Sequence, residues 1–65
     1  MSRSFLLGLM VLSCFAVAEM DLGVVAVAGM LRMEPSTTHR YMKTLLVVGL
    51  LEQDPSTRRY RLAGA

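Results

Sequence analysis

Cations and small hydroxyl side chains gather in one stretch of the 65-residue chain, between Glu34 and Val48. Hydroxyl and cationic groups donate hydrogen bonds, and the cations add positive charge. The chemistry that suits such a set is contact with the phosphate oxygens and base edges of a nucleic acid. The members of the set are Ser36, Thr37, His39, Arg40, Lys43 and Thr44.

A helix over about 35–48 would place these side chains on one face. Pro35 suits a first helical position, where its missing N–H costs nothing, and Glu34 before it can cap the helix. At a period of 3.6 residues the apolar side of this helix carries Thr38, Met42, Leu45 and Val48. The sequence therefore predicts an amphipathic helix with a basic face. The alternative is an ordinary helix whose basic face is merely solvated.

The positions of the polar residues along this helix suggest different roles. We expect Ser36 and Thr37, at the helix N-terminus, to bind backbone phosphate. Arg40 is expected to contact a base or a phosphate, and Lys43 a phosphate. His39 fits either a DNA contact or a packing residue. Thr44 is a weaker candidate at the distal edge of the face. Tyr41 suits core packing better than base reading.

A short hairpin is predicted after the helix. Gly49 fits a helix C-terminus, and residues 50–54 and 58–62 read as two strands joined by a turn at 55–57. A basic helix followed by a two-stranded ribbon is the arrangement of a winged helix-turn-helix, with the wing over about 51–62.

Alternation in the second strand divides it into an inner and an outer face. Tyr60 and Leu62 are expected to face the core, whereas Arg59 and Arg61 face outward. Arg58 is expected at or next to the tip, within reach of a phosphate or a minor groove. The three arginines are therefore candidate DNA contacts. They also suit a charged edge hairpin that resists aggregation, and the two roles are compatible.

Upstream residues supply two further helices. A first helix is predicted over about 5–18, capped by Ser2 or Ser4, and a second over 24–31, followed by a tight turn at 32–34. The predicted fold class is mainly α with a small β wing: a winged helix-turn-helix of three helices and a two-stranded antiparallel hairpin. We expect residues 1–65 to form one such DNA-binding domain.

Charge is distributed unevenly along the chain. Before Pro35 two cations stand against three carboxylates, whereas from Pro35 onward five cations stand against two carboxylates. The asymmetry indicates a polyanionic partner for the second half, and we expect double-stranded DNA.

The composition predicts a second kind of contact. The chain is 54% hydrophobic with a mean hydropathy of +0.49, which is too apolar for a small free monomer. The first predicted helix is apolar nearly all round, so its surplus face is expected to pair with a second copy of the chain. The alternative is that this face only fills the core beneath the other helices.

Several functional classes lack the residues they need. Cys14 is the only cysteine and His39 the only histidine, so neither a disulfide framework nor a metal site is expected. The sequence shows no nucleophile–base pair, no paired carboxylates and no phosphate-cradling glycine loop. We therefore expect no enzyme and no cofactor.

The N-terminal segment also resembles a secretory signal. Arg3 precedes an apolar run, and Ala16-Val17-Ala18 resembles a signal-peptidase cleavage site. The uncharged run over 4–18 is shorter than the roughly 18–20 residues that a spanning helix needs. A small exported or membrane-associated peptide is thus the alternative to a cytoplasmic DNA-binding domain, for which no membrane contact is expected.

The chain from roughly Ser4 to Leu62 resembles the N-terminal DNA-binding domain of IclR-type transcriptional regulators. Four motifs carry the resemblance in its most specific part: Ser36-Thr37-Thr38-His39-Arg40, Gly49-Leu50, Asp54-Pro55 and Tyr60-Arg61-Leu62. In that family the first motif opens the recognition helix, the second ends it, and the last two form the wing. Upstream, Gly8-Leu9 and Leu22-Gly23-Val24 are similar to the family's first helix and the entry to its second.

The resemblance implies regulation of transcription by dimers or tetramers bound to operators. It also implies a C-terminal domain that senses a small molecule, so an effector is expected only if such a domain exists beyond this chain. A truncated product that pairs with a full-length relative and blocks it is a further hypothesis.

The chain departs from the family pattern at the second helix and at two turns. Val25, Ala26 and Gly29 stand where the family usually has polar residues. Arg32 and Arg58 stand where it often has glycine. If either turn requires a positive φ, the arginine costs on the order of 1 kcal/mol.

Overall fold

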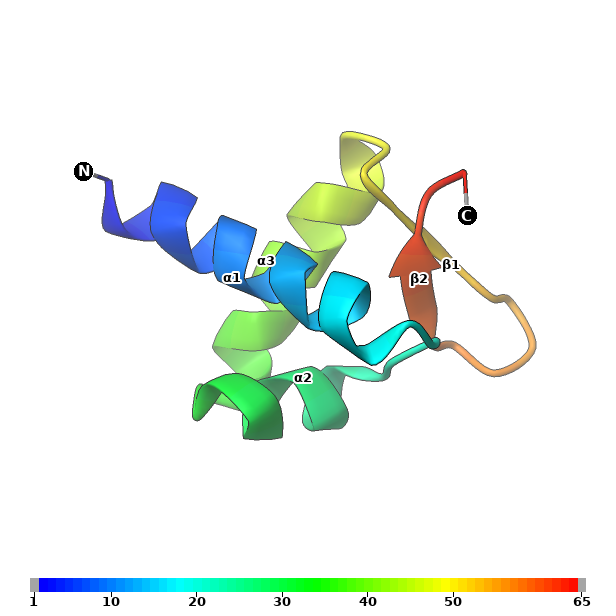
Figure 1. Cartoon of the computed structure of the whole chain (residues 1–65), viewed down its shortest axis with the longest axis horizontal. Coiled ribbons are helices and arrows are strands. Elements are labelled where there is room, and N and C mark those ends of the chain that lie inside the picture. Colours follow the sequence, from blue (N-terminus) through cyan, green and yellow to red (C-terminus); the bar gives the residue numbers. More distant parts are fainter. Residues whose placement is uncertain (1, 65) are drawn as a thin grey trace.

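The computed structural model describes residues 2–64, which form three helices and one antiparallel hairpin (Figure 1). In chain order the elements are α1 (Arg3–Ala18), α2 (Val24–Leu31), α3 (Pro35–Val47), β1 (Leu51–Gln53) and β2 (Tyr60–Leu62). The predicted fold class, a winged helix-turn-helix, is confirmed.

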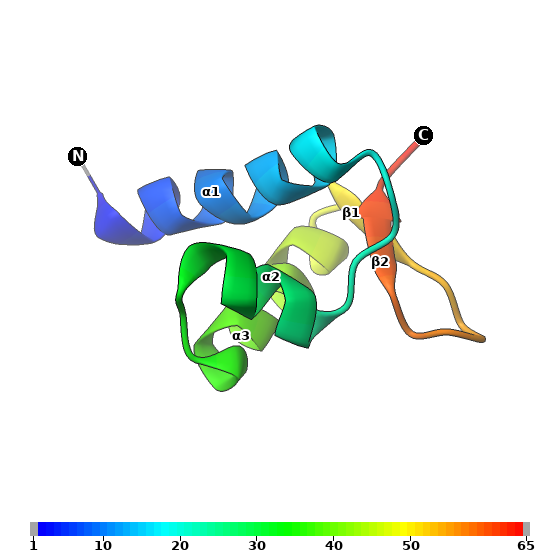
Figure 2. The ribbon, with the colours of Figure 1, turned by 60° about the horizontal axis from the view of Figure 1, so that its bottom comes forward.

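Helix α1 lies over α2 and α3, and the hairpin, here called the wing, packs at the C-terminal end of α1 (Figures 1 and 2). The N-terminal half of α1 extends away from the wing. The two halves of α1 consequently have different surroundings, and its buried residues, Val11, Cys14 and Phe15, all lie in the C-terminal half.

The first helix begins two residues earlier than predicted. The hydroxyl oxygen of Ser2 accepts a hydrogen bond from the backbone N–H of Phe5 at 3.3 Å, which caps the helix ahead of Arg3. The helix ends where Glu19 takes a left-handed conformation with φ 53°. Among residues 2–64, no helix combines the length and apolar character needed to cross a bilayer.

The second and third helices form a helix-turn-helix with a three-residue turn. The bounds of α2 match the prediction, and Arg32 ends the helix at φ 54°, with the Met33 N–H donating to the Ala28 carbonyl at 2.9 Å. At the start of α3 the Glu34 side chain makes no capping bond. Its carbonyl oxygen instead accepts from both the N–H and the hydroxyl of Thr38, each at 2.9 Å.

The core lies where α1, α2, α3 and the wing meet. Its buried side chains are Val11, Cys14, Phe15, Leu22, Val27, Met42, Leu45, Leu51 and Tyr60. The predicted core positions Thr38, Met42 and Leu45 are confirmed as buried. Val48 was assigned to the same face, and that prediction is wrong, since its side chain is 62% exposed. The helix ends at Val47 and the chain then turns through Gly49 at φ 85°.

The wing is shorter than predicted but is extended by a third segment. Leu51 pairs with Leu62 and Gln53 with Tyr60 in an antiparallel register. Residues 19–23 connect α1 to α2. Leu22 among them forms an isolated antiparallel bridge with Tyr60, which ties the α1–α2 connection to β2.

Candidate nucleic-acid interface

The outer face of α3 carries a stripe of exposed residues directly opposite its buried face. Ser36, Arg40, Lys43 and Val47 follow one another at intervals of three or four, and all four are exposed. Thr38, Met42 and Leu45 hold the other side of the helix in the core. Because the buried side chains fix the rotation of α3, the cations of the stripe must project away from the domain.

The N-terminus of α3 adds hydrogen-bond donors that are backbone groups. Pro35 occupies the first turn, and the backbone N–H groups of Ser36 and Thr37 after it have no acceptor within the helix. Ser36 is exposed and Thr37 is half-buried at this end. Such a helix start favours an anion both through its free N–H groups and through the helix dipole.

The remaining candidates on α3 differ in how free their side chains are. His39 is exposed, so it does not pack in the core. The Thr44 hydroxyl donates to the Arg40 carbonyl at 3.0 Å, and Thr44 lies beside a groove of about 430 Å³ between α1 and α3. Arg40 lines the same groove. Thr44 therefore lies at the edge of the stripe, toward α1, and its hydroxyl hydrogen is already used.

The outer surface of α2 is apolar. Val25 is 76% and Met30 49% exposed, and Ala26 and Gly29 are exposed between them. The exposed residues of α2 therefore offer no side-chain donors, and five of the seven cations of the chain lie on α3 and the wing.

A side-chain-capped turn forms the tip of the wing. The Oδ1 atom of Asp54 accepts three hydrogen bonds, from the Ser56 N–H at 2.8 Å, the Ser56 hydroxyl at 2.6 Å and the Thr57 N–H at 3.2 Å. These bonds hold the pKa of the Asp54 carboxyl far below its usual range. The turn is thus ordered by a charged carboxylate.

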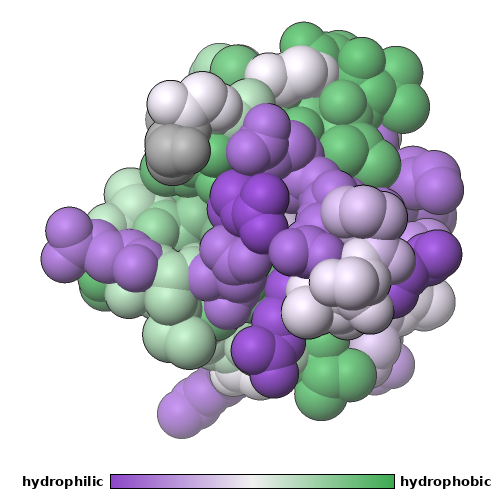
Figure 3. All heavy atoms as spheres, turned by 90° about the vertical axis from the view of Figure 1, so that its right-hand side faces the viewer, coloured by the Kyte–Doolittle hydropathy of each residue, from purple (hydrophilic) through white to green (hydrophobic). Residues whose placement is uncertain are grey.

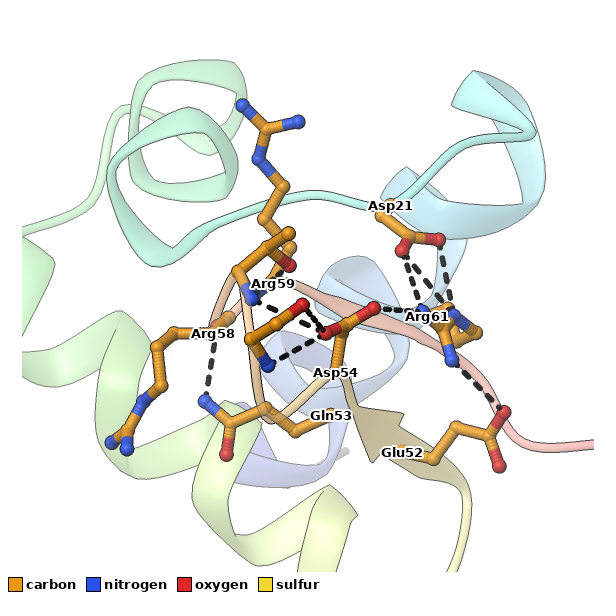
Figure 4. Close-up of polar contacts among 9 residues, drawn as sticks. Asp21, Glu52, Gln53, Asp54, Arg58, Arg59 and Arg61 are labelled. Carbon is orange, nitrogen blue, oxygen red and sulfur yellow. Dashed lines mark hydrogen bonds and ion pairs between the residues drawn. The ribbon is translucent and has the colours of Figure 1, made fainter.

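Two arginines follow the turn and are exposed. Arg58 adopts a left-handed backbone conformation with φ 67°, and its carbonyl accepts from the Gln53 side-chain amide at 3.0 Å. The Arg58 and Arg59 side chains extend away from the carboxylates of the wing (Figure 4). Their positions agree with the sequence-based expectation of a basic wing tip.

Arg61 has different surroundings from the other two arginines. Its guanidinium meets Asp21 through Nη2–Oδ2 at 2.9 Å, Asp54 through Nη2–Oδ2 at 3.1 Å and Glu52 through Nη1–Oε1 at 3.7 Å (Figure 4). The hydrogen bond to Arg61 is the main reason that the pKa of Asp21 is lowered. Asp21 was not among the predicted site residues, since nothing in the sequence relates this loop residue to an arginine 40 positions away.

The cations of α3 and the wing therefore form two groups. Within residues 2–64, every ion pair closer than 4 Å has Arg61 as its cation. Arg40, Lys43, Arg58 and Arg59 make no such pair within that part of the chain. Seen from the wing end, hydrophilic side chains form a band down the middle of the surface, with hydrophobic ones above it and to its left (Figure 3). The unpaired cations are available to a polyanion.

The fold combines three helices with a basic wing, and a three-residue turn precedes the exposed basic helix. This arrangement defines a winged helix-turn-helix DNA-binding domain of the kind found in transcription regulators. Residues 8–55 match the family described as the IclR helix-turn-helix domain. The chain belongs to this family.

Two solved structures show how much of the domain is shared. HmgR of Pseudomonas aeruginosa is 31% identical with a TM-score of 0.89, over 95% of this chain and 26% of that protein. An IclR family transcriptional regulator from Brucella abortus is 32% identical with a TM-score of 0.90, over 97% of this chain and 24% of that protein. The chain thus spans about a quarter of the length of these two structures. No curated protein matches it.

Proposed function

We propose that this domain binds double-stranded DNA sequence-specifically, with α3 in the major groove and the wing on the backbone or in the minor groove. Arg40 would contact a base edge or a phosphate and Lys43 a phosphate, while Ser36 and Thr37 hold backbone phosphate at the helix start. His39 and Thr44 flank these contacts, and Arg58 and Arg59 approach from the wing.

One observation supports this proposal above the others. Arg40 and Lys43 are exposed on the side of α3 opposite Thr38 and Met42, and no carboxylate neutralises them within residues 2–64. A merely solvated basic face on a small domain would usually include carboxylates at helical spacing from its cations, as in paired surface helices. No acidic residue follows Glu34 in this helix.

The experiment is a titration of the purified chain against a pool of double-stranded DNA, followed by fluorescence anisotropy at low and moderate salt. We expect binding that weakens steeply with salt and that enriches particular sequences over successive rounds. Absence of binding at low salt would contradict the proposal. Equal binding of all sequences would remove the claim of specificity and leave only phosphate contact.

We further propose that two copies pair through the N-terminal half of α1. Phe5 is 65%, Leu6 42% and Leu9 47% exposed on this half, which projects beyond the rest of the domain. Phe5 and Leu9 also border the groove beside Arg40 and Leu50. Pairing there would bury apolar surface and set two recognition helices on one DNA duplex.

We place the domain in the cytoplasm as the DNA-binding part of a transcription regulator. Control by a small molecule belongs to this proposal only where the domain is joined to an effector domain. The exported-peptide hypothesis makes the opposite prediction, because cleavage after Ala18 would remove Val11, Cys14 and Phe15 from the core. Cell fractionation separates the two: a cleaved, membrane-associated product would contradict the cytoplasmic regulator.

A further inference from the structure

A continuous series of side-chain contacts joins the α1–α2 loop to the tip of the wing. Asp21 accepts from Arg61 at both carboxylate oxygens, with Nε–Oδ1 at 3.2 Å and Nη2–Oδ2 at 2.9 Å. Arg61 also donates to Oδ2 of Asp54 at 3.1 Å, which leaves Oδ1 of Asp54 for Ser56 and Thr57 (Figure 4). The carboxylate that orders the tip is thereby connected to a second, distant segment of the chain.

Other hydrogen bonds close the tip internally, since the Asp54 N–H donates to the Arg59 carbonyl and the Arg58 N–H to the Asp54 carbonyl, each at 2.8 Å, but these bonds do not tie the tip to the helices. Each strand of the wing has three residues, and an isolated hairpin of this size is marginally stable. The bridge between Leu22 and Tyr60 holds the base of the hairpin. Beyond that base, the turn with Arg58 and Arg59 extends from the domain, and Asp54 bonded to Arg61 is its link back to the α1–α2 loop.

The charges around Arg61 disfavour a direct contact with DNA. One guanidinium faces the carboxylates of Asp21, Glu52 and Asp54, and its side chain is 33% exposed. A phosphate approaching Arg61 would meet three negative groups around one positive group. Arg58 and Arg59, in contrast, have no carboxylate within 4 Å among residues 2–64.

We propose that Asp21 and Arg61 are positioning residues, which hold the wing tip so that Arg58 and Arg59 meet the DNA backbone, and that Arg61 makes no DNA contact itself. The inference rests on the proposed DNA binding. It assigns a function in DNA affinity to Asp21, an acidic residue outside both the recognition helix and the wing.

The decisive variant is Asp21→Asn, because the two possible roles of Arg61 predict opposite signs. If Arg61 bound phosphate, removing a carboxylate beside it would free a cation and tighten binding. If the pair positions the tip, the same change weakens binding, by roughly fivefold at moderate salt for the loss of one or two phosphate contacts. Glu19→Gln is the matched control, since it makes the same change of charge two residues away, and Glu19 has no hydrogen bond or ion pair to Arg61 among the described residues.

A double-mutant comparison separates positioning from a general loss of stability. Arg58→Ala should weaken DNA binding in the natural chain but have much less effect when combined with Asp21→Asn, because a displaced tip no longer brings Arg58 to the DNA. Equal effects in both backgrounds would overturn the proposal. Circular dichroism at the titration temperature establishes that each variant is folded.

Arg61→Lys keeps the result interpretable if Asp21→Asn does not fold. Lysine retains the charge and can serve a phosphate, but it cannot bridge two carboxylates with a planar fork. Positioning predicts weaker binding by Arg61→Lys, whereas direct phosphate contact predicts little change. If the natural chain itself does not bind DNA, the proposed function fails and this inference with it. If it binds, and Asp21→Asn binds as tightly as Glu19→Gln, only the positioning role is overturned.

Discussion

Leu22 and Tyr60 exchange both of their backbone hydrogen bonds, with the Leu22 N–H donating to the Tyr60 carbonyl at 2.9 Å and the Tyr60 N–H donating back at 2.8 Å. Both side chains are buried. This pair makes the α1–α2 connection a third partner of the hairpin, so the wing is attached to the segment that leads into the helix-turn-helix. The helix-turn-helix and the wing consequently belong to one packed unit.

Arg40 and Lys43 should respond differently to truncation. We expect Arg40→Ala to lose about 1–3 kcal/mol of discrimination between the preferred sequence and an unrelated one, if Arg40 reads a base. Lys43→Ala should weaken binding to all DNA sequences about equally. It should also reduce the slope of the logarithm of the binding constant against the logarithm of salt concentration by about one. Competition titrations at several salt concentrations measure both quantities. Unchanged binding by Arg40→Ala would show that the recognition face is placed wrongly.

Arg32→Gly should stabilise the domain. Arg32 ends α2 in the left-handed region at φ 54°, where glycine is free of the strain that a Cβ imposes. We expect a gain of about 1 kcal/mol in the free energy of unfolding, measured by urea denaturation. Arg32→Ala is the control, since it removes the same charge but retains the Cβ. A gain of equal size in both variants would point to charge instead of backbone strain.

The Cys14 thiol should be unreactive in the native domain. Its side chain is 4% exposed, burial raises the pKa of the thiol, and the S–H donates to the Met10 carbonyl at 3.5 Å. We expect slow labelling by a thiol-specific reagent in buffer and rapid labelling in denaturant. Labelling at the rate of a free cysteine under native conditions would mean that α1 detaches from the core.

Protonation of Asp54 in the wing should contribute to a loss of folding stability in acid. The pKa of Asp54 is held far below its ordinary value by Ser56 and Thr57, so the ionised carboxylate stabilises the folded state above the unfolded pKa of about 3.9. That contribution is lost as the pH falls below about 4 and toward the native pKa. We expect Asp54→Asn to be less stable than the natural chain at neutral pH and to lose less stability in acid, in thermal melts across this range. A parallel pH dependence in the two proteins would contradict this role.

Leu9→Glu should produce a monomer if the α1 faces pair. Leu9 is 47% exposed and borders the groove between α1 and α3, so a carboxylate there would be buried against a second copy. Sedimentation should show a loss of self-association. Val25→Glu places the same charge on the exposed face of α2 and is expected to leave self-association unchanged. Equal effects of the two substitutions on self-association would contradict the placement of the interface on α1.

Local patterns determined the elements of this domain. The period of Thr38, Met42 and Leu45 fixed the buried side of α3, and the alternation around Tyr60 fixed the inner face of β2. Both patterns depend only on neighbouring residues and the geometry of a helix or strand. The two turns were identified differently, because the resemblance to the IclR family marked Arg32 and Arg58 as positions where glycine is common, and both have a positive φ.

Tertiary structure alone decided which cations are free. Arg59 and Arg61 are equivalent in the alternation of the second strand, yet only Arg61 meets the carboxylates of Asp21, Glu52 and Asp54. The pairing with Asp21 joins residues 40 positions apart, and the bridge from Leu22 to Tyr60 brings those two segments together. Whether a charge is exposed or neutralised depends on neighbours brought by the fold, and no periodicity along the chain encodes them. The exposure of Val48 was missed for a related reason, because it depends on where α3 ends and the chain turns away from the core.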